Sequence, residues 1–186
     1  MLIRTFIAAN LATPVGEEMT KVQSVLQKAK GDIRWVKPQG FHLTFRFLGN
    51  IEPDRVAPVL TALRAAVRHQ SQFRVRMQGL GAFPSLTRPR VLWARLTGGG
   101  LQELHTTIES ALGSCGFPPE GHAFRPHITL GRVRSQRGWN HVLERVKEYL
   151  QYDFGESLID TVTLYRSDLE PGGAVYTALG VADLKR

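Results

Sequence analysis

The sequence lacks the features that stabilise extracellular proteins or anchor a chain in a membrane. Cysteine occurs once in 186 residues, at Cys115, so no disulfide framework can form, and this fits a reducing compartment. No run approaches the roughly 20 apolar residues of a membrane span. The apolar N-terminus is interrupted by Arg4 and is shorter than the roughly 7–15 apolar residues of a secretory signal. We therefore expect a cytoplasmic protein with no membrane association.

Several motifs that carry catalysis or bind metal are also missing. The chain has no paired carboxylates, no cysteine pair, no His-Glu-x-x-His helix and no Gly-x-Ser-x-Gly elbow. The Gly98-Gly99-Gly100 run lacks the Lys-Ser/Thr ending of a P-loop and predicts a flexible connection. Cys115 is interpreted as a small buried side chain at a helix end, not as a nucleophile. We predict no cofactor and no metal.

Basic residues outnumber acidic residues by 24 to 16, which gives a net charge of +8, and the sequence pI is about 10.1. Most of the basic residues are arginine, whose planar set of donors suits phosphate groups. The charge therefore favours a polyanionic partner, with RNA or DNA as the candidates. The alternative is a basic surface with no role in nucleic-acid binding.

The order of the predicted elements repeats along the chain. In the first unit, periodicity predicts a strand at 3–8, a helix at 15–29, a strand at 41–48, a helix at 53–69 and a strand at 73–80. The second unit repeats this order at 91–96, 101–115, 127–133, 139–150 and 158–167, and a last strand follows at 175–181. Gly31 and Gly116 stand where a helix C-terminus favours glycine. We predict one domain over residues 1–186, made of two pseudo-symmetric α+β lobes that span 1–85 and 86–186.

A His-x-Thr-x tetrapeptide occurs at the equivalent strand of each unit, as His42-Leu43-Thr44-Phe45 and His127-Ile128-Thr129-Leu130. In a strand, each histidine shares a face with its threonine, while the apolar neighbours point to the core. Imidazole titrates near neutrality, so two imidazoles on either side of a phosphorus can act as general base and general acid. The threonine hydroxyls can donate to phosphate oxygens. One such motif is weak evidence, but two at matched positions predict a catalytic pair.

The residues around the motifs give further expectations. Strict alternation places Phe45 and Phe47 in the core and Arg46 on the face of His42. The same rule sends Arg132 away from His127, unless a bulge at Gly131 returns it to the motif side, where it can bind phosphate. More distant candidates for an RNA path, with solvated loop charges as the alternative reading, are Arg88, Arg90, Arg134 and Arg137. The aromatic candidates for base stacking, with a core role as their alternative, are Trp35, Phe83, Trp93 and Tyr176.

These motifs and their flanks resemble the 2H phosphoesterases over nearly the whole chain, and in particular the RNA 2′,3′-cyclic phosphodiesterase family, also called 2′-5′ RNA ligases. The segments that carry the resemblance are Arg34-Trp35-Val36, Phe41–Gly49, Phe83-Pro84, Pro89–Trp93, Arg125–Arg132, Leu164–Ser167 and Pro171–Tyr176. The resemblance implies a bilobed α+β fold, with two antiparallel sheets and outer helices around a central cleft.

The resemblance also implies metal-independent opening of RNA 2′,3′-cyclic phosphates to 2′-phosphate ends, with ligation as the reverse chemistry. It makes His42 the proton donor and His127 the proton acceptor, and it assigns phosphate binding to Thr44, Thr129 and Arg132. The expected partner is RNA with cyclic phosphate ends, and the expected oligomeric state is a monomer. Two alternatives stay open: a sister activity on 2′-5′ oligonucleotides or small cyclic nucleotides, and a non-catalytic RNA-binding module.

Overall fold

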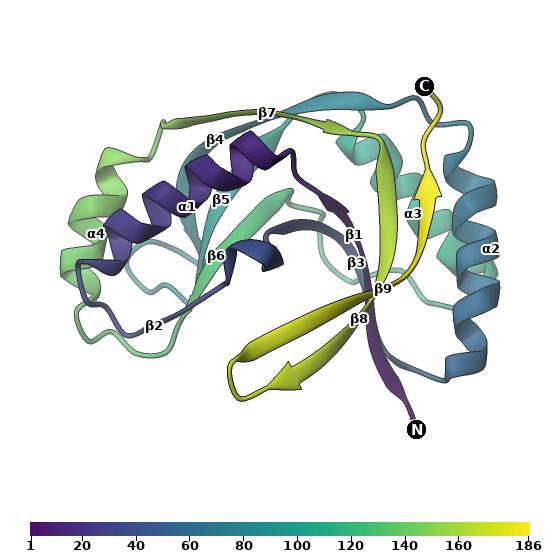
Figure 1. Cartoon of the computed structure of the whole chain (residues 1–186), viewed down its shortest axis with the longest axis horizontal. Coiled ribbons are helices and arrows are strands. Elements are labelled where there is room, and N and C mark those ends of the chain that lie inside the picture. Colours follow the sequence, from purple (N-terminus) through teal and green to yellow (C-terminus); the bar gives the residue numbers. More distant parts are fainter.

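A computed structural model describes all residues, 1–186, as an α+β protein (Figure 1). The strands are β1 (Ile3–Asn10), β2 (Ile33–Trp35), β3 (His42–Ile51), β4 (Phe73–Phe83), β5 (Val91–Thr97), β6 (His127–Val133), β7 (Asp153–Ile159), β8 (Thr161–Glu170) and β9 (Gly173–Asp183). The α-helices are α1 (Thr13–Gln27), α2 (Val56–Val67), α3 (Leu101–Ser114) and α4 (Trp139–Glu148). Short 3₁₀ turns, η1 (Pro38–Gly40) and η2 (Pro53–Arg55), precede β3 and α2.

The strands form one antiparallel sheet in the order β7-β4-β5-β6-β3-β1-β8-β9, and β2 pairs with β6 beside β3. This order is symmetric about the β6–β3 boundary, because β5 corresponds to β1, β4 to β8 and β7 to β9. The two halves meet through the Leu43–Ile128 pair. The predicted α+β class and antiparallel pairing are confirmed, but the expected pair of sheets is joined into a single curled sheet.

The helices pack in two pairs, α1 with α4 on one half and α2 with α3 on the other (Figure 1). Each helix turns an apolar stripe toward the sheet, as shown by the buried Met19, Leu63, Leu104 and Val142. The motif strands contribute Leu43, Phe45, Ile128 and Leu130 to the same continuous core. The helix-covered face of the sheet is therefore apolar, and the opposite face is free to carry polar groups.

The structure corrects three of the sequence predictions. The strand expected at 158–167 is two strands, because β7 pairs with β4 up to Ile159, whereas β8, which begins at Thr161, pairs with β1 and β9. The strands β2 and β7 were not predicted, since β2 is short and β7 contains Gly155 and several polar residues. At the end of α1, Lys30 rather than Gly31 adopts a positive φ of 56°. Gly31 instead lies against α4, where an added Cβ would come within 2.5 Å of Val142.

None of the helices has the length and apolar character needed to cross a lipid bilayer.

Candidate active site

The two His-x-Thr-x strands lie side by side at the centre of the sheet. Leu43 of β3 and Ile128 of β6 are cross-strand partners, and both are fully buried on the helix-covered face. Their neighbours His42, Thr44, His127 and Thr129 therefore project from the opposite face, called the motif face below. The antiparallel register sets His42 diagonal to His127 and opposite Thr129. The tertiary structure thus gathers both predicted motifs into one cluster.

A bulge follows the threonine in each motif strand. In β3, Ile7 pairs with Arg46 and Ala8 with Thr44, so Phe45 is the extra residue. In β6, Leu92 pairs with Gly131 and Trp93 with Thr129, so Leu130 is the extra residue. Each bulge sends two consecutive side chains to the helix-covered face and reverses the alternation beyond it.

In β3 this reversal overturns the predicted positions of Arg46 and Phe47. Arg46 lies on the helix-covered face, where it is only 6% exposed. Phe47 lies on the motif face, is 51% exposed and contacts Phe6, with ring centroids 5.9 Å apart. Strict alternation gave the opposite assignment because it took no account of the bulge.

In β6 the bulge brings Arg132 back to the motif face. Gly131 faces the helix side, where an added Cβ would come within 2.6 Å of Ile33 and 3.2 Å of Trp35. Arg132 pairs with Val91 and is exposed. The irregularity expected at Gly131 is therefore present, and it places a guanidinium on the same face as His127 and Thr129.

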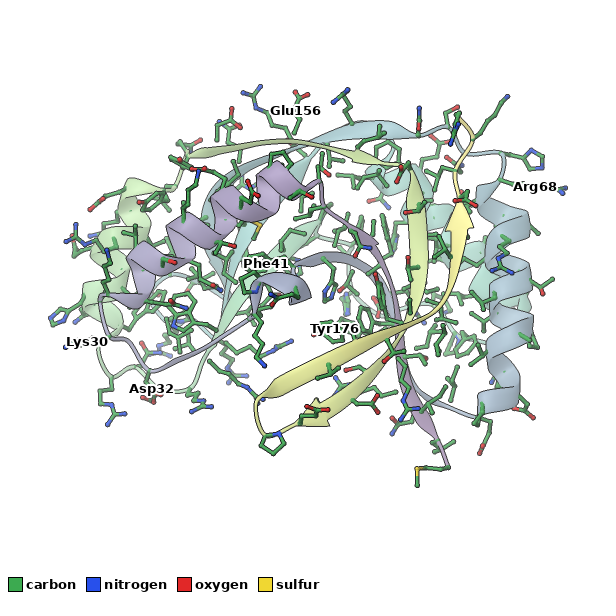
Figure 2. The ribbon with its side chains drawn as sticks, in the orientation of Figure 1. Lys30, Asp32, Phe41, Arg68, Glu156 and Tyr176 are labelled. Carbon is green, nitrogen blue, oxygen red and sulfur yellow. The ribbon has the colours of Figure 1, made fainter.

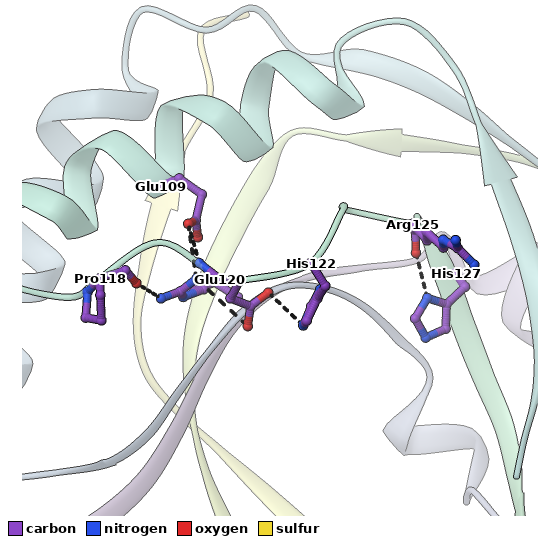
Figure 3. A network of polar contacts seen from close by, with 7 residues as sticks. Glu109, Pro118, Glu120, His122, Arg125 and His127 are labelled. Atoms are coloured by element: carbon purple, nitrogen blue, oxygen red, sulfur yellow. Dashed lines mark hydrogen bonds and ion pairs between the residues drawn. The ribbon is translucent and has the colours of Figure 1, made fainter. Parts of the chain in front are cut away.

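Both imidazoles are held by the same backbone contact. Nδ1 of His42 lies 2.7 Å from the Gly40 carbonyl. Nδ1 of His127 lies 2.6 Å from the Arg125 carbonyl (Figure 3). A carbonyl only accepts, so each Nδ1 carries the proton and each neutral ring keeps the lone pair on Nε2. Neither Nε2 has a hydrogen-bond partner within the protein. Both are therefore available to accept or return a proton.

Aromatic rings pack edge-on against both imidazoles. Tyr176 stands at 89° to His42 with centroids 5.1 Å apart, and Phe83 stands at 88° to His127 at 5.0 Å. Phe6 also packs on His42 at 4.9 Å. These contacts fix the ring orientations and exclude water from one side of each imidazole. Figure 2 shows Tyr176 on β9, below Phe41, the residue that follows η1.

This environment lowers the pKa of both histidines. Burial lowers the pKa of His42 to about 4, although the Gly40 carbonyl favours the charged ring. Burial also lowers the pKa of His127, and the charge of Arg132 lowers it further, against the favourable Arg125 carbonyl. Burial raises the pKa of Tyr176, and the charge of Arg132 opposes this effect. Both imidazoles are therefore neutral at pH 7 in the free protein.

Behind β3, Arg46 ties the motif strand to the segment that leads into β6. Its guanidinium contacts Glu109 of α3 at 3.1 Å, the carbonyl of Pro118, and Glu120 at 4.0 Å (Figure 3). The Glu120 carboxylate also lies 3.6 Å from His122. The same segment continues to Arg125, whose carbonyl holds His127. Arg46 is thus a structural contact between β3 and the segment from α3 to β6, and it does not face the motif residues.

The other residues suggested by the sequence are divided between the two faces. Phe83, Trp93 and Tyr176 are half-buried around the histidines, but Trp35 shares the helix-covered face with Gly131. Arg88, Arg90, Arg134 and Arg137 are all exposed and form no ion pair.

Sequence reasoning missed several residues near the motifs. Phe6 stacks on Tyr165 at 5.3 Å beneath His42, and the cations of Arg95 and Arg125 lie 5.9 Å from the rings of Trp93 and Phe83. Strand pairing brings these residues to the site from other elements, so the local pattern around the motifs carries no signal for them.

No group of three or more His, Cys, Asp or Glu side chains is arranged to hold a metal ion. The motif face carries two imidazoles, two hydroxyls and a guanidinium.

Known proteins similar in sequence extend over most of the chain. An Aeropyrum pernix protein is 33% identical over 79% of this chain and 84% of its own length. A Thermus thermophilus protein is 31% identical over 95% and 88%, and a Methanothermobacter thermautotrophicus protein is 27% identical over 97% and 98%. All three are named RNA 2′,3′-cyclic phosphodiesterase.

Solved structures with a similar fold and a family sequence model also match this chain over most of its length. A crystal structure of a Thermus thermophilus protein matches with a TM-score of 0.83 and 27% identity over 98% of both chains. Escherichia coli LigT complexed with 3′-AMP shares the fold, with a TM-score of 0.76 and 22% identity over the whole of both chains. The sequence model described as LigT like Phosphoesterase matches residues 11–93 and 97–176. The chain therefore belongs to the LigT-like phosphoesterase family, a group of 2H phosphoesterases.

Proposed function

We propose that this protein hydrolyses 2′,3′-cyclic phosphate ends of RNA to 2′-phosphate ends without a metal ion. The observation that carries the proposal is the pairing of His42 and His127 on one face, each with a free Nε2 and each next to a threonine of the other motif. The names of the relatives supply the substrate class.

In the proposed reaction His127 accepts a proton from water through Nε2. The resulting hydroxide attacks phosphorus, and the bond from phosphorus to the 3′ oxygen breaks. His42 gives a proton to the departing 3′ oxygen, so the product carries a 2′-phosphate and a 3′-hydroxyl. A bound phosphate between the two imidazoles lets one act as base and the other as acid in the same turnover.

Thr44, Thr129 and Arg132 are proposed to bind the non-bridging phosphate oxygens. The two hydroxyls donate from opposite sides of the β3–β6 boundary, and the guanidinium adds a charge-assisted donor from the second half. Negative charge grows on these oxygens during attack, so such donors stabilise the transition state more than the ground state.

Because the pKa values of both histidines are lowered in the free protein, substrate binding must favour the protonated form of His42. In the free protein both rings are neutral at pH 7, whereas His42 must be protonated to act as donor. An anionic phosphate beside the ring favours the imidazolium and raises its pKa. In the proposed enzyme, His42 therefore becomes protonated when the anionic substrate binds.

The alternatives differ in substrate or in class. A sister activity on 2′-5′ oligonucleotides or small cyclic nucleotides uses the same two histidines, but the net charge of +8 favours a polyanionic chain. A non-catalytic RNA-binding module would not require two imidazoles with free Nε2 atoms. Ligation of a 5′-hydroxyl is the reverse of the same chemistry and is proposed only as an accompanying activity.

We also propose a cytoplasmic monomer built as a single domain of two pseudo-symmetric lobes, residues 1–85 and 86–186. The single cysteine supports the reducing compartment. The symmetric strand order supports the repeat, although each half of the sheet takes strands from both repeats: β4 lies beside β5, and β8 lies beside β1.

The test is to incubate the purified protein, in the presence of EDTA, with an oligonucleotide that ends in a 2′,3′-cyclic phosphate and to map the product phosphate. We expect a 2′-phosphate and turnover unchanged by EDTA. An unchanged oligonucleotide would refute the proposed reaction, and turnover lost in EDTA and restored by a divalent ion would refute metal independence. A 2′-5′-linked oligonucleotide and a cyclic mononucleotide, assayed in parallel, decide between the alternatives.

A further inference from the structure

Two arginines stand directly opposite one another at the edge of the motif face. Arg34 of β2 and Arg132 of β6 are cross-strand partners in antiparallel register. The neighbouring pair, Trp35 and Gly131, faces the helix-covered side, so Arg34 and Arg132 both project from the motif face. Both side chains are exposed.

No carboxylate within the protein compensates these two charges. Neither guanidinium lies within 4 Å of an Asp or Glu oxygen, and neither makes a side-chain hydrogen bond. The carboxylate closest in sequence, Asp32, accepts a hydrogen bond from the Ser135 hydroxyl instead. Like charges opposite each other destabilise a sheet, so this pair weakens the free protein unless an anion lies between the two guanidinium groups.

The two arginines are not equivalent with respect to the histidines. The charge of Arg132 lowers the pKa of His127 and that of Tyr176, whereas Arg34 affects neither group. Arg34 lies on β2, which pairs only with β6 and occupies the β3 side of β6, beyond the first residue of β3. Arg132 is therefore placed for the reacting phosphate, and Arg34 for an anion beyond it.

We propose that Arg34 binds the RNA backbone phosphate on the 5′ side of the terminal nucleotide, next to the phosphate held by Arg132. This assignment rests on the proposed function, because it takes a cyclic-ended RNA as the substrate. It makes Arg34 a specificity residue that distinguishes a polynucleotide end from a free cyclic nucleotide. Arg134 and Arg137, which follow β6 along the chain, are also exposed.

The experiment compares two small substrates that differ by one phosphate. One is a nucleoside 2′,3′-cyclic phosphate with a 5′-hydroxyl, and the other is the same compound with a 5′-phosphate in the place of the backbone phosphate. We expect the wild type to favour the 5′-phosphorylated compound in kcat/KM by about tenfold, the scale of one exposed charge-assisted contact. Arg34→Gln should abolish that preference and leave kcat/KM for the 5′-hydroxyl compound within about twofold of wild type.

Arg68→Gln is the matched control, because it removes one exposed arginine from the end of α2, at the opposite end of the molecule from Lys30 (Figure 2). It should keep the wild-type preference. Arg34→Gln should also unfold at the same or a higher urea concentration than wild type, since it relieves a like-charge pair. With a cyclic-ended oligonucleotide, its salt dependence should weaken by roughly 0.7 in the slope of log affinity against log salt.

Three results would overturn the assignment of Arg34. They are a wild type with no preference, an Arg34→Gln variant that keeps the preference, and equal losses on both compounds, which would place Arg34 at the reacting phosphate. Failure of the wild type to turn over either compound, or a cyclic-ended oligonucleotide, would instead refute the proposed function and this inference with it.

Discussion

Phe47 and Arg132 occupy equivalent positions in the two halves of the sheet. Each lies three residues after its motif threonine, just beyond a bulge, and each projects from the motif face. The pseudo-symmetry that makes His42 and His127 alike is thus broken here, because one half presents an aromatic ring and the other a guanidinium. The two halves of the site therefore offer different contacts to a bound nucleotide.

Arg132→Gln should lower kcat/KM by about 10- to 100-fold, the cost of one charge-assisted hydrogen bond to a phosphate. The loss should be equal for a cyclic mononucleotide and a cyclic-ended RNA, because both carry the reacting phosphate. Phe47→Leu, at the equivalent position, is the control and should stay within a few-fold of wild type on the mononucleotide. An Arg132→Gln enzyme with wild-type kcat/KM would contradict the phosphate role of this residue.

His42→Ala and His127→Ala should each lower kcat by about 10²–10⁴-fold, the usual contribution of a positioned acid or base. Thr44→Ala and Thr129→Ala should cost less, since each removes one donor from a shared phosphate site. Circular dichroism and urea unfolding check that the variants remain folded, and His141→Ala on the exposed surface of α4 is the matched histidine control. A wild-type rate in either motif variant would disprove the two-histidine mechanism.

His42 should make the stability of the free protein depend on pH between about 6.5 and 4. Its pKa falls from 6.5 to about 4 on folding, so the unfolded chain binds the proton more tightly than the native state does. The stabilisation is complete above pH 6.5 and is lost as the pH falls toward 4, by an amount on the order of 3 kcal/mol. Urea unfolding at pH 7 and pH 4.5 measures the loss, which should be smaller in His42→Ala.

The pKa of His42 should also change when phosphate binds. In a proton NMR titration, inorganic phosphate should raise the pKa of His42, because an anion at the motif face favours the imidazolium. An unchanged His42 pKa at saturating phosphate would show that a bound phosphate does not stabilise the His42 imidazolium.

Arg46→Met should lower the free energy of unfolding by about 3 kcal/mol, because it leaves the Glu109 carboxylate partly buried without its cation. The double variant Arg46→Met/Glu109→Leu should recover part of this loss, since it removes both charges together. Urea denaturation of the wild type, both single variants and the double variant gives the coupling between the two residues. If the losses of the single variants simply add in the double variant, the ion pair does not stabilise the fold.

Much of the fold and the identity of the motif residues could be predicted from the sequence alone. Apolar alternation around His42 and His127 predicted two strands with both histidines away from the core, and the structure has both. Helical periodicity located all four helices to within a few residues. These features depend on neighbours in the chain, and local patterns of side chains record them directly.

Only the tertiary structure decided which other residues join the motifs. The bulges at Phe45 and Leu130 depend on how β3 and β6 pair with β1 and β5. They place Phe47 instead of Arg46 on the motif face, and they place Arg132 there as well. Arg34 reaches the site through the β2–β6 pairing, across nearly one hundred residues of chain. The histidine pKa values likewise depend on burial by residues from distant strands. The sequence by itself determined the reactive groups, whereas strand register and burial, which arise from contacts between distant segments, decided their partners and their charge.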